Sequence, residues 1–227
     1  MSGLRTDAPT WTRSLAAVVQ FVDPFTGLPI RVPFSVSLPA LRWTAQRWDT
    51  DATYRFSLPN VPLVSGVPQL PVGTFALSIT PAGGPYAALE PRQITLPPAA
   101  PHPPPVLAAD YLVALALWPT VAFRVPAGET AVTARLVSAT NQNVGGLKAR
   151  LFDAASPPPP PNVYTRSDAA GQFLIRLPAL RRGNAANPTA LLDVQVFDAA
   201  NAPIAVTPAT LTVPIGQLTG FVTLSIP

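Results

Sequence analysis

The segment at residues 96–106 reads LPPAAPHPPPV, and six of its eleven residues are proline. Each proline fixes φ at about −65° and lacks an amide hydrogen, so such a run favours an extended, solvated polyproline II spacer over a helix or a sheet. We therefore expect a linker here, with a separately folded half of the chain on each side of it.

The two halves on either side of this linker resemble each other. Both show the alternation of apolar and polar residues that is typical of β-strands, and both carry a short turn around an acidic residue. Both also end in a strand-like run bounded by proline. The chain of 227 residues is long enough for two domains of about 100 residues each, and its 31 prolines disfavour a helical protein. The sequence therefore predicts an all-β protein with two β-sandwich domains joined by the proline-rich linker.

The expected boundaries follow from the positions of the strand-like runs. They give an N-terminal arm at 1–14, a first sandwich at 15–96, the linker at 97–109 and a second sandwich at 110–227. An alternative is that residues 110–125 pair with the first sandwich, which moves the boundary toward Pro126. A further ambiguous stretch is 39–48, which could form a short helix or a loop.

Three motifs of the first half occur in a recognisable order. They are VDPFTGLPI at 22–30, TDATYRF at 50–56 and LPVGTFALSIT at 70–80, followed by ITLP at 94–97. This order resembles the carboxypeptidase regulatory-like domains, which are transthyretin-like, or prealbumin-like, β-sandwiches. The first half departs from the family pattern at Thr53, where glycine is usual, whereas SDAAGQF at 167–173 keeps the glycine.

The resemblance covers about residues 16–97 of the first half and, less fully, 131–227 of the second. It implies two Greek-key sandwiches of the transthyretin-like or immunoglobulin-like kind, and it implies no particular activity. Alternation in the strand-like runs predicts which side chains point into the two cores. These are Phe56, Phe75, Leu77, Phe173, Ile175 and Val196.

The charge pattern bears on possible partners. The chain has a formal net charge of +4, and the positive excess is the same in both halves. A nucleic-acid-binding protein concentrates its basic residues in a patch or a stripe, whereas the one adjacent basic pair here is Arg181 and Arg182. We therefore expect no nucleic-acid partner. No apolar run approaches the 18 residues or so of a membrane-spanning helix, so we expect no membrane insertion either.

The residues that carry most enzymatic chemistry are scarce. The single histidine, His102, falls in the proline-rich linker, and the chain has no cysteine. A serine triad or a zinc site needs more than this, so we expect no enzyme, no cofactor, no metal and no small-molecule ligand. Asp49 and Asp51 could face a cation together, but we expect them to cap turn amides. Lys148, the only lysine, is the one residue available for an isopeptide cross-link and is expected to be a solvated strand residue.

The composition favours a protein that works through surface contacts. Charged residues make up 11% of the chain, compared with about 25% in typical domains, and such a surface suits a subunit that its neighbours cover. We expect a spacer or decoration subunit of a larger protein assembly, such as a phage-like or contractile-injection-type particle. The candidate contacts with other protein subunits are Trp11, Trp43, Trp48 and Trp118.

Two further expectations complete this interpretation. The N-terminus lacks a basic region followed by an apolar core, so we expect cytoplasmic synthesis without a signal peptide and incorporation into a particle. The alternative function is a carbohydrate-binding or adhesion module that uses Trp43, Trp48 and Tyr54. It requires these aromatic side chains to be exposed on one face.

Overall fold

The computed structural model of this chain describes residues 13–59, 63–64, 67–68, 71–81, 84–87, 92–96, 111–155, 164–181 and 188–227. Within these ranges the protein is built from β-strands, with a 3-10 turn, η1, at Pro39–Leu41 and a residue of 3-10 conformation at Tyr111. The all-β class is therefore confirmed. Most of the expected N-terminal arm, with Trp11, and the expected linker, with His102, lie outside the described residues. No helix in the described ranges is long and apolar enough to cross a membrane.

The chain divides into two compact units that each combine three separate segments. Unit 1 consists of Met1–Phe21, Pro29–Ala82 and Pro91–Leu115, and unit 2 of Val22–Leu28, Gly83–Glu90 and Ala116–Pro227. Because these segments alternate along the sequence, the chain passes from one unit to the other five times.

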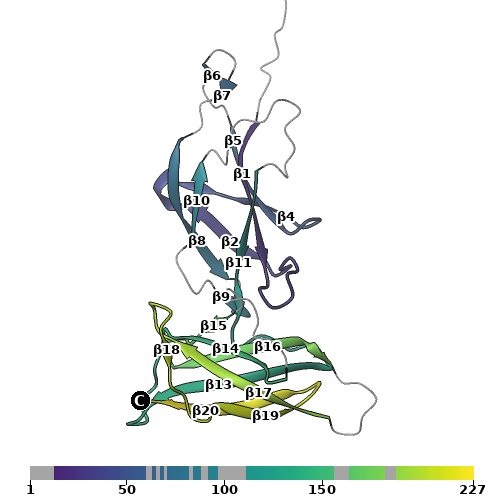
Figure 1. Cartoon of the computed structure of the whole chain (residues 1–227). Helices are drawn as coiled ribbons and strands as arrows, with labels where there is room; N and C mark the ends of the chain where they lie inside the picture. Colours follow the sequence, from purple (N-terminus) through teal and green to yellow (C-terminus); the bar gives the residue numbers. More distant parts are fainter. Residues whose placement is uncertain are drawn as a thin grey trace, which may run out of the picture. The chain divides into compact units, whose positions relative to one another are not determined.

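Unit 1 contains two four-stranded sheets (Figure 1). The first has the order β11 (Leu112–Ala116), β1 (Arg13–Val22), β5 (Thr53–Pro59) and β4 (Gln46–Trp48). The second has the order β10 (Arg92–Leu96), β8 (Gly73–Pro81), β2 (Phe34–Leu38) and β3 (Trp43–Thr44). A short pair, β6 (Leu63–Val64) with β7 (Val67–Pro68), completes the unit. The ambiguous stretch 39–48 thus forms η1 followed by two short strands.

Unit 2 contains a three-stranded and a five-stranded sheet. The order in the first is β16 (Gln172–Arg181), β13 (Glu129–Ser138) and β20 (Leu218–Ile226), in which β13 pairs antiparallel with β16 and parallel with β20. The second has the order β15 (Thr165–Arg166), β14 (Lys148–Asp153), β17 (Thr189–Phe197) and β18 (Pro203–Ile204), and β19 (Thr210–Pro214) also pairs with β17. A short pair, β9 (Tyr86–Ala87) with β12 (Trp118–Pro119), belongs to the same unit.

The strand orders reveal the internal repeat that the sequence predicted. In one sheet of unit 1 the strand order is β11-β1-β5, which matches β20-β13-β16 in unit 2. In the other sheet of unit 1 the order is β10-β8-β2, which matches β19-β17-β14 in unit 2. The first and last strands of each sandwich are therefore neighbours in the same sheet. Both units are β-sandwiches with one topology, and unit 1 has the additional edge strand β4 beside β5.

The repeat changes the place of the proline-rich stretch. We expected residues 97–109 to join the two sandwiches, but β10 precedes this stretch, β11 follows it, and both strands belong to sheets of unit 1. The stretch therefore connects two strands of one sandwich, and the last strand of that sandwich comes after it. For Leu112–Leu115 the observed order agrees with the alternative in which this region pairs with the first sandwich.

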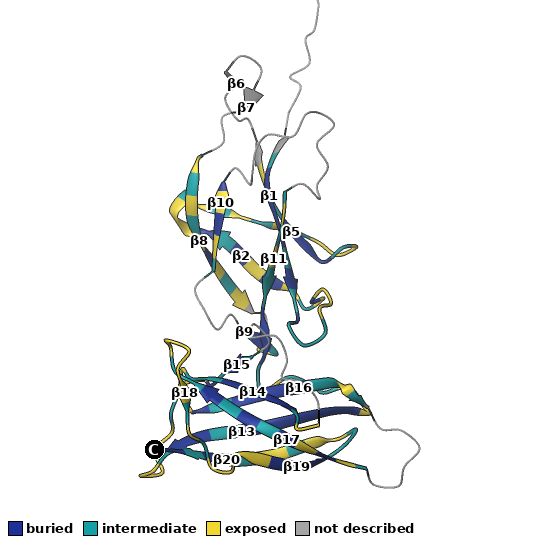
Figure 2. Ribbon diagram, in the orientation of Figure 1, coloured by how far each residue is buried: buried dark blue, intermediate teal, exposed yellow. Residues whose placement is uncertain are grey.

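The cores form where alternation predicted them (Figure 2). In unit 2 the buried cluster includes Phe173, Ile175 and Val196, each at most 2% exposed. In unit 1 Phe56 and Leu77 are buried, whereas Phe75 is only half-buried. Unit 1 also has a ring cluster, in which the ring centroids of Phe21 lie 5.2 Å from those of both Phe34 and Tyr54. Aromatic contacts of this kind add stability beyond the area that they bury.

The turn before β16 needs its glycine. Gly171 has φ +73°, and a Cβ atom built there would lie 2.5 Å from the backbone oxygen of Leu136. The turn before β5 solves the same problem differently, since Ala52 takes the positive φ, at +54°. Tyr54 lies opposite Val19 in the ladder between β1 and β5. Gly171 lies beside Leu136 at the equivalent position of unit 2, at the start of the ladder between β13 and β16. The glycine of the family pattern therefore corresponds to Tyr54 in space and not to Thr53.

Candidate functional site

A cluster of buried charges lies in unit 2 and is the most unusual feature of its interior. We call it the Arg176 cluster and define it as Asp23, Tyr86, Phe123, Glu129 and Arg176. The three charged members are at most 6% exposed. Asp23 directly follows β1, Tyr86 begins β9, Glu129 begins β13 and Arg176 lies within β16. The cluster therefore joins three segments that are far apart in the sequence.

The guanidinium group of Arg176 is held from two sides. Its Nε donates to Glu129 Oε1 at 2.6 Å and its Nη2 donates to Glu129 Oε2 at 2.8 Å, while Nη1 donates to Asp23 Oδ2. The Tyr86 hydroxyl donates to the same Asp23 oxygen at 3.1 Å. The ring of Phe123 lies 4.6 Å from the guanidinium carbon. Each nitrogen of the planar fork thus has a carboxylate acceptor, and an aromatic face covers the group.

The alternation of β16 explains why an arginine can occupy this position. Phe173, Ile175 and Leu177 point to the sandwich core, so Arg176 points to the opposite face of the sheet. Burial by itself would lower the pKa of Arg176, but the hydrogen bond to Glu129 and the charge of Asp23 raise it, so the group remains a cation. Burial, and then the charge of Asp23, raises the pKa of Tyr86, so its hydroxyl remains a neutral donor.

The chemistry of this arrangement is that of a fixed, noncovalent cross-link. Charges taken out of water destabilise a fold unless they are paired and hydrogen-bonded, and here one cation serves two carboxylates. In the sequence, Asp23 is noticeable only as part of the motif VDPFTGLPI, and neither Glu129 nor Arg176 was expected at a site. One signal was available, since Arg176 interrupts the apolar run in FLIRLPAL and Glu129 stands at the start of the strand-like run ETAVTARLV.

The turn aspartates act as the sequence predicted. Asp51 Oδ1 accepts from the amide of Thr53 at 3.1 Å, and Asp168 Oδ1 accepts from the amide of Ala170 at 2.9 Å. Asp49 differs, since it pairs with Arg47 at 2.5 Å on the surface. Burial would raise the pKa of Asp51, but hydrogen bonds from Thr53 and Arg55 outweigh it and lower that pKa. Among the described residues, no group of three His, Cys, Asp or Glu side chains could hold a metal ion.

The tryptophans proposed as partner contacts occupy different environments. Trp48 on β4 is 44% exposed, and the guanidinium carbon of Arg55 lies 4.1 Å from its ring centroid. Trp43 on β3 is half-buried. Trp118 is only 3% exposed and stacks on Tyr164 with ring centroids 5.6 Å apart. Trp118 is therefore an interior residue of unit 2.

The aromatic face that carbohydrate recognition required does not form as expected. Tyr54 is 1% exposed, and its hydroxyl accepts from the amide of Phe34 at 2.8 Å and donates to the carbonyl of Val32 at 3.4 Å. Burial also raises the pKa of this phenol. Tyr54 therefore fixes the start of β2 from inside unit 1, and Trp48 is the exposed member of the proposed set.

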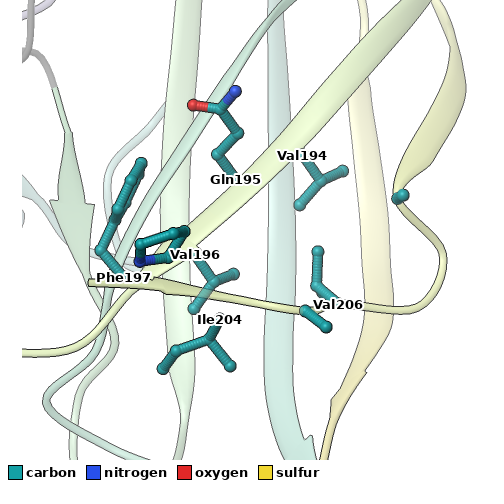
Figure 3. Close-up of a pocket in the computed structure, with 9 residues that line it drawn as sticks. Val194, Gln195, Val196, Phe197, Ile204 and Val206 are labelled. Carbon is teal, nitrogen blue, oxygen red and sulfur yellow. The ribbon is translucent and has the colours of Figure 1, made fainter. Parts of the chain in front are cut away.

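An apolar groove of about 400 Å³ opens at the edge of the five-stranded sheet (Figure 3). The chain pairs with β17 first as β18 and again as β19. Between these two strands it moves away from β17 and forms the bridge between Thr207 and Ser225 of β20, and the groove forms at this detour. Gln195 is the only polar residue of the lining, and its Oε1 accepts from Arg150 Nε at 2.7 Å. The lining consists of Val194, Gln195, Val196, Phe197, Pro203, Ile204, Ala205, Val206 and Ala209.

The single lysine, Lys148, contacts Asn201 and Tyr164. Lys148 Nζ donates to Asn201 Oδ1 at 2.8 Å in an exposed hydrogen bond, and the same nitrogen lies 4.8 Å from the ring centroid of Tyr164. These contacts describe a surface residue on a strand, which is what the sequence predicted for Lys148.

Comparison with known proteins gave matches only among solved structures. No family model matches the chain, and no curated protein sequence matches it. The shaft pilin SpaA of Lactobacillus rhamnosus GG, as its E269A mutant, is 12% identical, with 95% of this chain and 98% of that chain covered at a TM-score of 0.27. The major pilin subunit BcpA of Bacillus cereus, as its D312A variant, is 8% identical over 95% of this chain and 99% of that chain, also at 0.27.

A longer protein matches as well. The TIE protein of Bacillus anthracis is 11% identical, with 94% of this chain covered at a TM-score of 0.29, and this chain spans 34% of its length. The expected location, cytoplasmic synthesis followed by incorporation into a particle, is wrong against these matches, because several of the matched chains are named as pilins, the subunits of pili. The matched structures thus include those of a shaft, an ancillary and a major pilin.

Proposed function

We propose that this protein is a non-enzymatic structural subunit that works through contacts with other protein subunits of an extended, pilus-like assembly. The observation that carries the proposal is the Arg176 cluster. Buried ion pairs hold Val22–Leu28 to Ala116–Pro227, and the hydrogen bond from Tyr86 to Asp23 adds Gly83–Glu90. A cross-link between distant segments suits a protein whose task is to keep its form under load.

The surface supports the same role. Large apolar side chains are exposed on the strands of unit 2, with Leu191 at 49%, Leu218 at 50% and Phe221 at 62%. Exposed apolar groups on a chain with 11% charged residues suit faces that neighbouring subunits cover. The positive charge is split evenly between the two halves of the sequence, and for this reason we propose no nucleic-acid partner.

We also propose that both sandwiches are of the carboxypeptidase regulatory-like kind. The support is the pair of equivalent turns in which Asp51 and Asp168 each accept an amide hydrogen bond just before β5 and β16. We expected a phage-like or contractile-injection-type particle, and we now propose a fibre as the assembly to test first. The pilin names of the matched structures enter only in that choice.

The experiment is to recover the protein from its native source by an affinity tag and to image what purifies with it. We expect fibres or fibre fragments with other protein subunits. Deleting residues 1–14, or replacing Trp48 with alanine, should lower incorporation while each variant still unfolds cooperatively. Replacing the buried Trp118 with phenylalanine is the control, and it should leave incorporation unchanged.

The competing function gives a different result. Recovery as a free monomer that binds glycans, with binding lost in Trp48→Ala and no fibre present, would overturn the structural proposal in favour of a carbohydrate-binding module.

A further inference from the structure

Strand β20 is an edge strand that the described part of the chain leaves open along its first six residues. It pairs with β13 on one side. On its other side the only described pairing is the bridge between Ser225 and Thr207. Residues 218–223 therefore have a free edge, within the described ranges, that continues directly into an existing antiparallel pairing (Figure 1).

This open stretch carries neither of the residue types that most often protect an edge, and its one irregularity is the register shift of its pairing with β13 between Thr219 and Val222. Natural sheets block edge strands with charges, prolines or short lengths, but β20 is nine residues long, LTGFVTLSI, with neither charge nor proline. Phe221 is 62% exposed and Leu218 is 50% exposed. The other edge strands of the three-stranded and five-stranded sheets each carry a charge or a proline, namely Arg166 in β15, Pro178 in β16, Pro203 in β18 and Pro214 in β19.

The direction of the backbone groups can be deduced from the bridge. The amide of Thr207 donates to the carbonyl of Ser225, and the amide of Ser225 donates to the carbonyl of Thr207, both at 2.8 Å. Strand geometry repeats every second residue, so the amide and carbonyl of Thr223 point to the same open side. An incoming antiparallel strand would extend the ladder from there.

We propose that β20 pairs antiparallel with β20 of a second copy of this chain, about a twofold axis at Val222. This register sets Phe221 opposite the partner's Thr223 and Thr223 opposite the partner's Phe221. In an antiparallel pair about a twofold axis, the residues near the axis face the same residues of the second copy. Any charge near the axis would therefore face a like charge, which would destabilise the pair. β20 has none.

The inference deepens the proposed function, on which it rests for its biological meaning, because it names a second copy as one of the protein partners. The paired stretch is short. It buries much less than the roughly 800 Å² per partner of a standard stable interface, so we expect a weak dimer with a dissociation constant of about 10–100 µM. Several such contacts together could still hold a multivalent assembly.

The first test measures self-association of the full chain by sedimentation equilibrium over about 5–500 µM. We expect a reversible dimer, which Phe221→Glu weakens at least about tenfold because the new charge faces the partner's strand. Leu191→Glu is the matched control, since Leu191 is similarly exposed but lies on β17 in the other sheet; it should leave the dimer unchanged. A chain that stays monomeric throughout, or an equal effect of both variants, contradicts the proposal.

The second test does not depend on the stability of the Phe221 variant. The chain has no cysteine, so Val222→Cys places a single thiol at the proposed axis. In a non-hydrogen-bonded antiparallel pair the Cα atoms lie about 4.5 Å apart, within the range of a disulfide. We expect rapid formation of a disulfide-linked dimer, whereas Thr212→Cys on the exposed face of β19 should react only slowly. Equal rates for the two variants would overturn the inference.

The two proposals can fail separately. If Phe221→Glu enters the native assembly as efficiently as the unmodified chain and no dimer forms in solution, the β20 contact is wrong and the structural role stands. If the β20 dimer forms but no assembly is recovered, the structural role is wrong and the contact stands.

Discussion

Arg176 and Glu129 form a two-point ion pair at 2.6 and 2.8 Å inside unit 2, although 47 residues separate them in the sequence. Asp23, which is 153 residues from Arg176, closes the other side of the guanidinium group. These separations mean that the contacts form only when the strands have already reached their places. The cluster is therefore a product of the fold that also stabilises it.

Removing the cation should destabilise the protein strongly. Arg176→Met leaves Asp23 and Glu129 buried without their partner, and we expect a loss of about 3–5 kcal/mol in the free energy of unfolding, measured with urea at neutral pH. Arg55→Met is the control, because the Arg55 pair with Asp51 is partly exposed and should contribute less than about 1 kcal/mol. A similar loss in both variants would show that burial of the cluster does not matter.

The raised pKa of Tyr86 predicts a loss of stability in alkaline solution. The folded state keeps the phenol proton that the unfolded chain releases near its ordinary pKa of 10. This contribution is therefore fully present below about pH 10 and is lost as the pH rises toward the folded pKa. Tyr86→Phe keeps the ring against Phe123 but removes the ionisable group, so its urea midpoint should fall less between about pH 9 and 11.

Tyr54 also has a raised pKa, so some alkaline sensitivity should remain in Tyr86→Phe. The double variant with Tyr54→Phe should lose most of what remains. Identical pH profiles for the unmodified chain and Tyr86→Phe would contradict the assignment.

Gly171 should tolerate no side chain. Gly171→Ala forces a Cβ atom against the Leu136 carbonyl at 2.5 Å in a residue with positive φ, and we expect a cost of about 3 kcal/mol. Gly128 also has a positive φ, at +81°, but open space around it. Gly128→Ala should therefore cost only about 1 kcal/mol. The measurement is the midpoint of thermal or urea unfolding for the two variants side by side.

Cutting the chain in the proline-rich stretch should not release two free domains. A protease site inserted at residues 99–102 separates β10 from β11, and β11 is hydrogen-bonded beside β1 in unit 1. The two fragments should therefore elute together in gel filtration and separate only in denaturant. Elution as two independent folded fragments without denaturant would show that the boundary lies in this stretch after all.

The sequence allowed the local parts of this fold to be predicted, and it did not allow the long-range ones. Phe56 and Phe173 were placed in the cores because strand alternation is a local property, and the Asp51 turn was expected because aspartates in turns commonly cap backbone amides. The assignment of Leu112–Leu115 to unit 1 depends on a pairing across most of that unit, which no local pattern specifies. The Arg176 cluster escaped prediction for the same reason.

The parallel pairing of β13 with β20 has a mechanical consequence. Because the two strands run in the same direction, tension applied between the start of β13 at Glu129 and the end of β20 at Ile226 pulls them in opposite directions along their length (Figure 1). The hydrogen bonds between the two strands are then loaded at the same time, so they cannot break one after another. A subunit that transmits tension through its C-terminal end would resist extension at this ladder first.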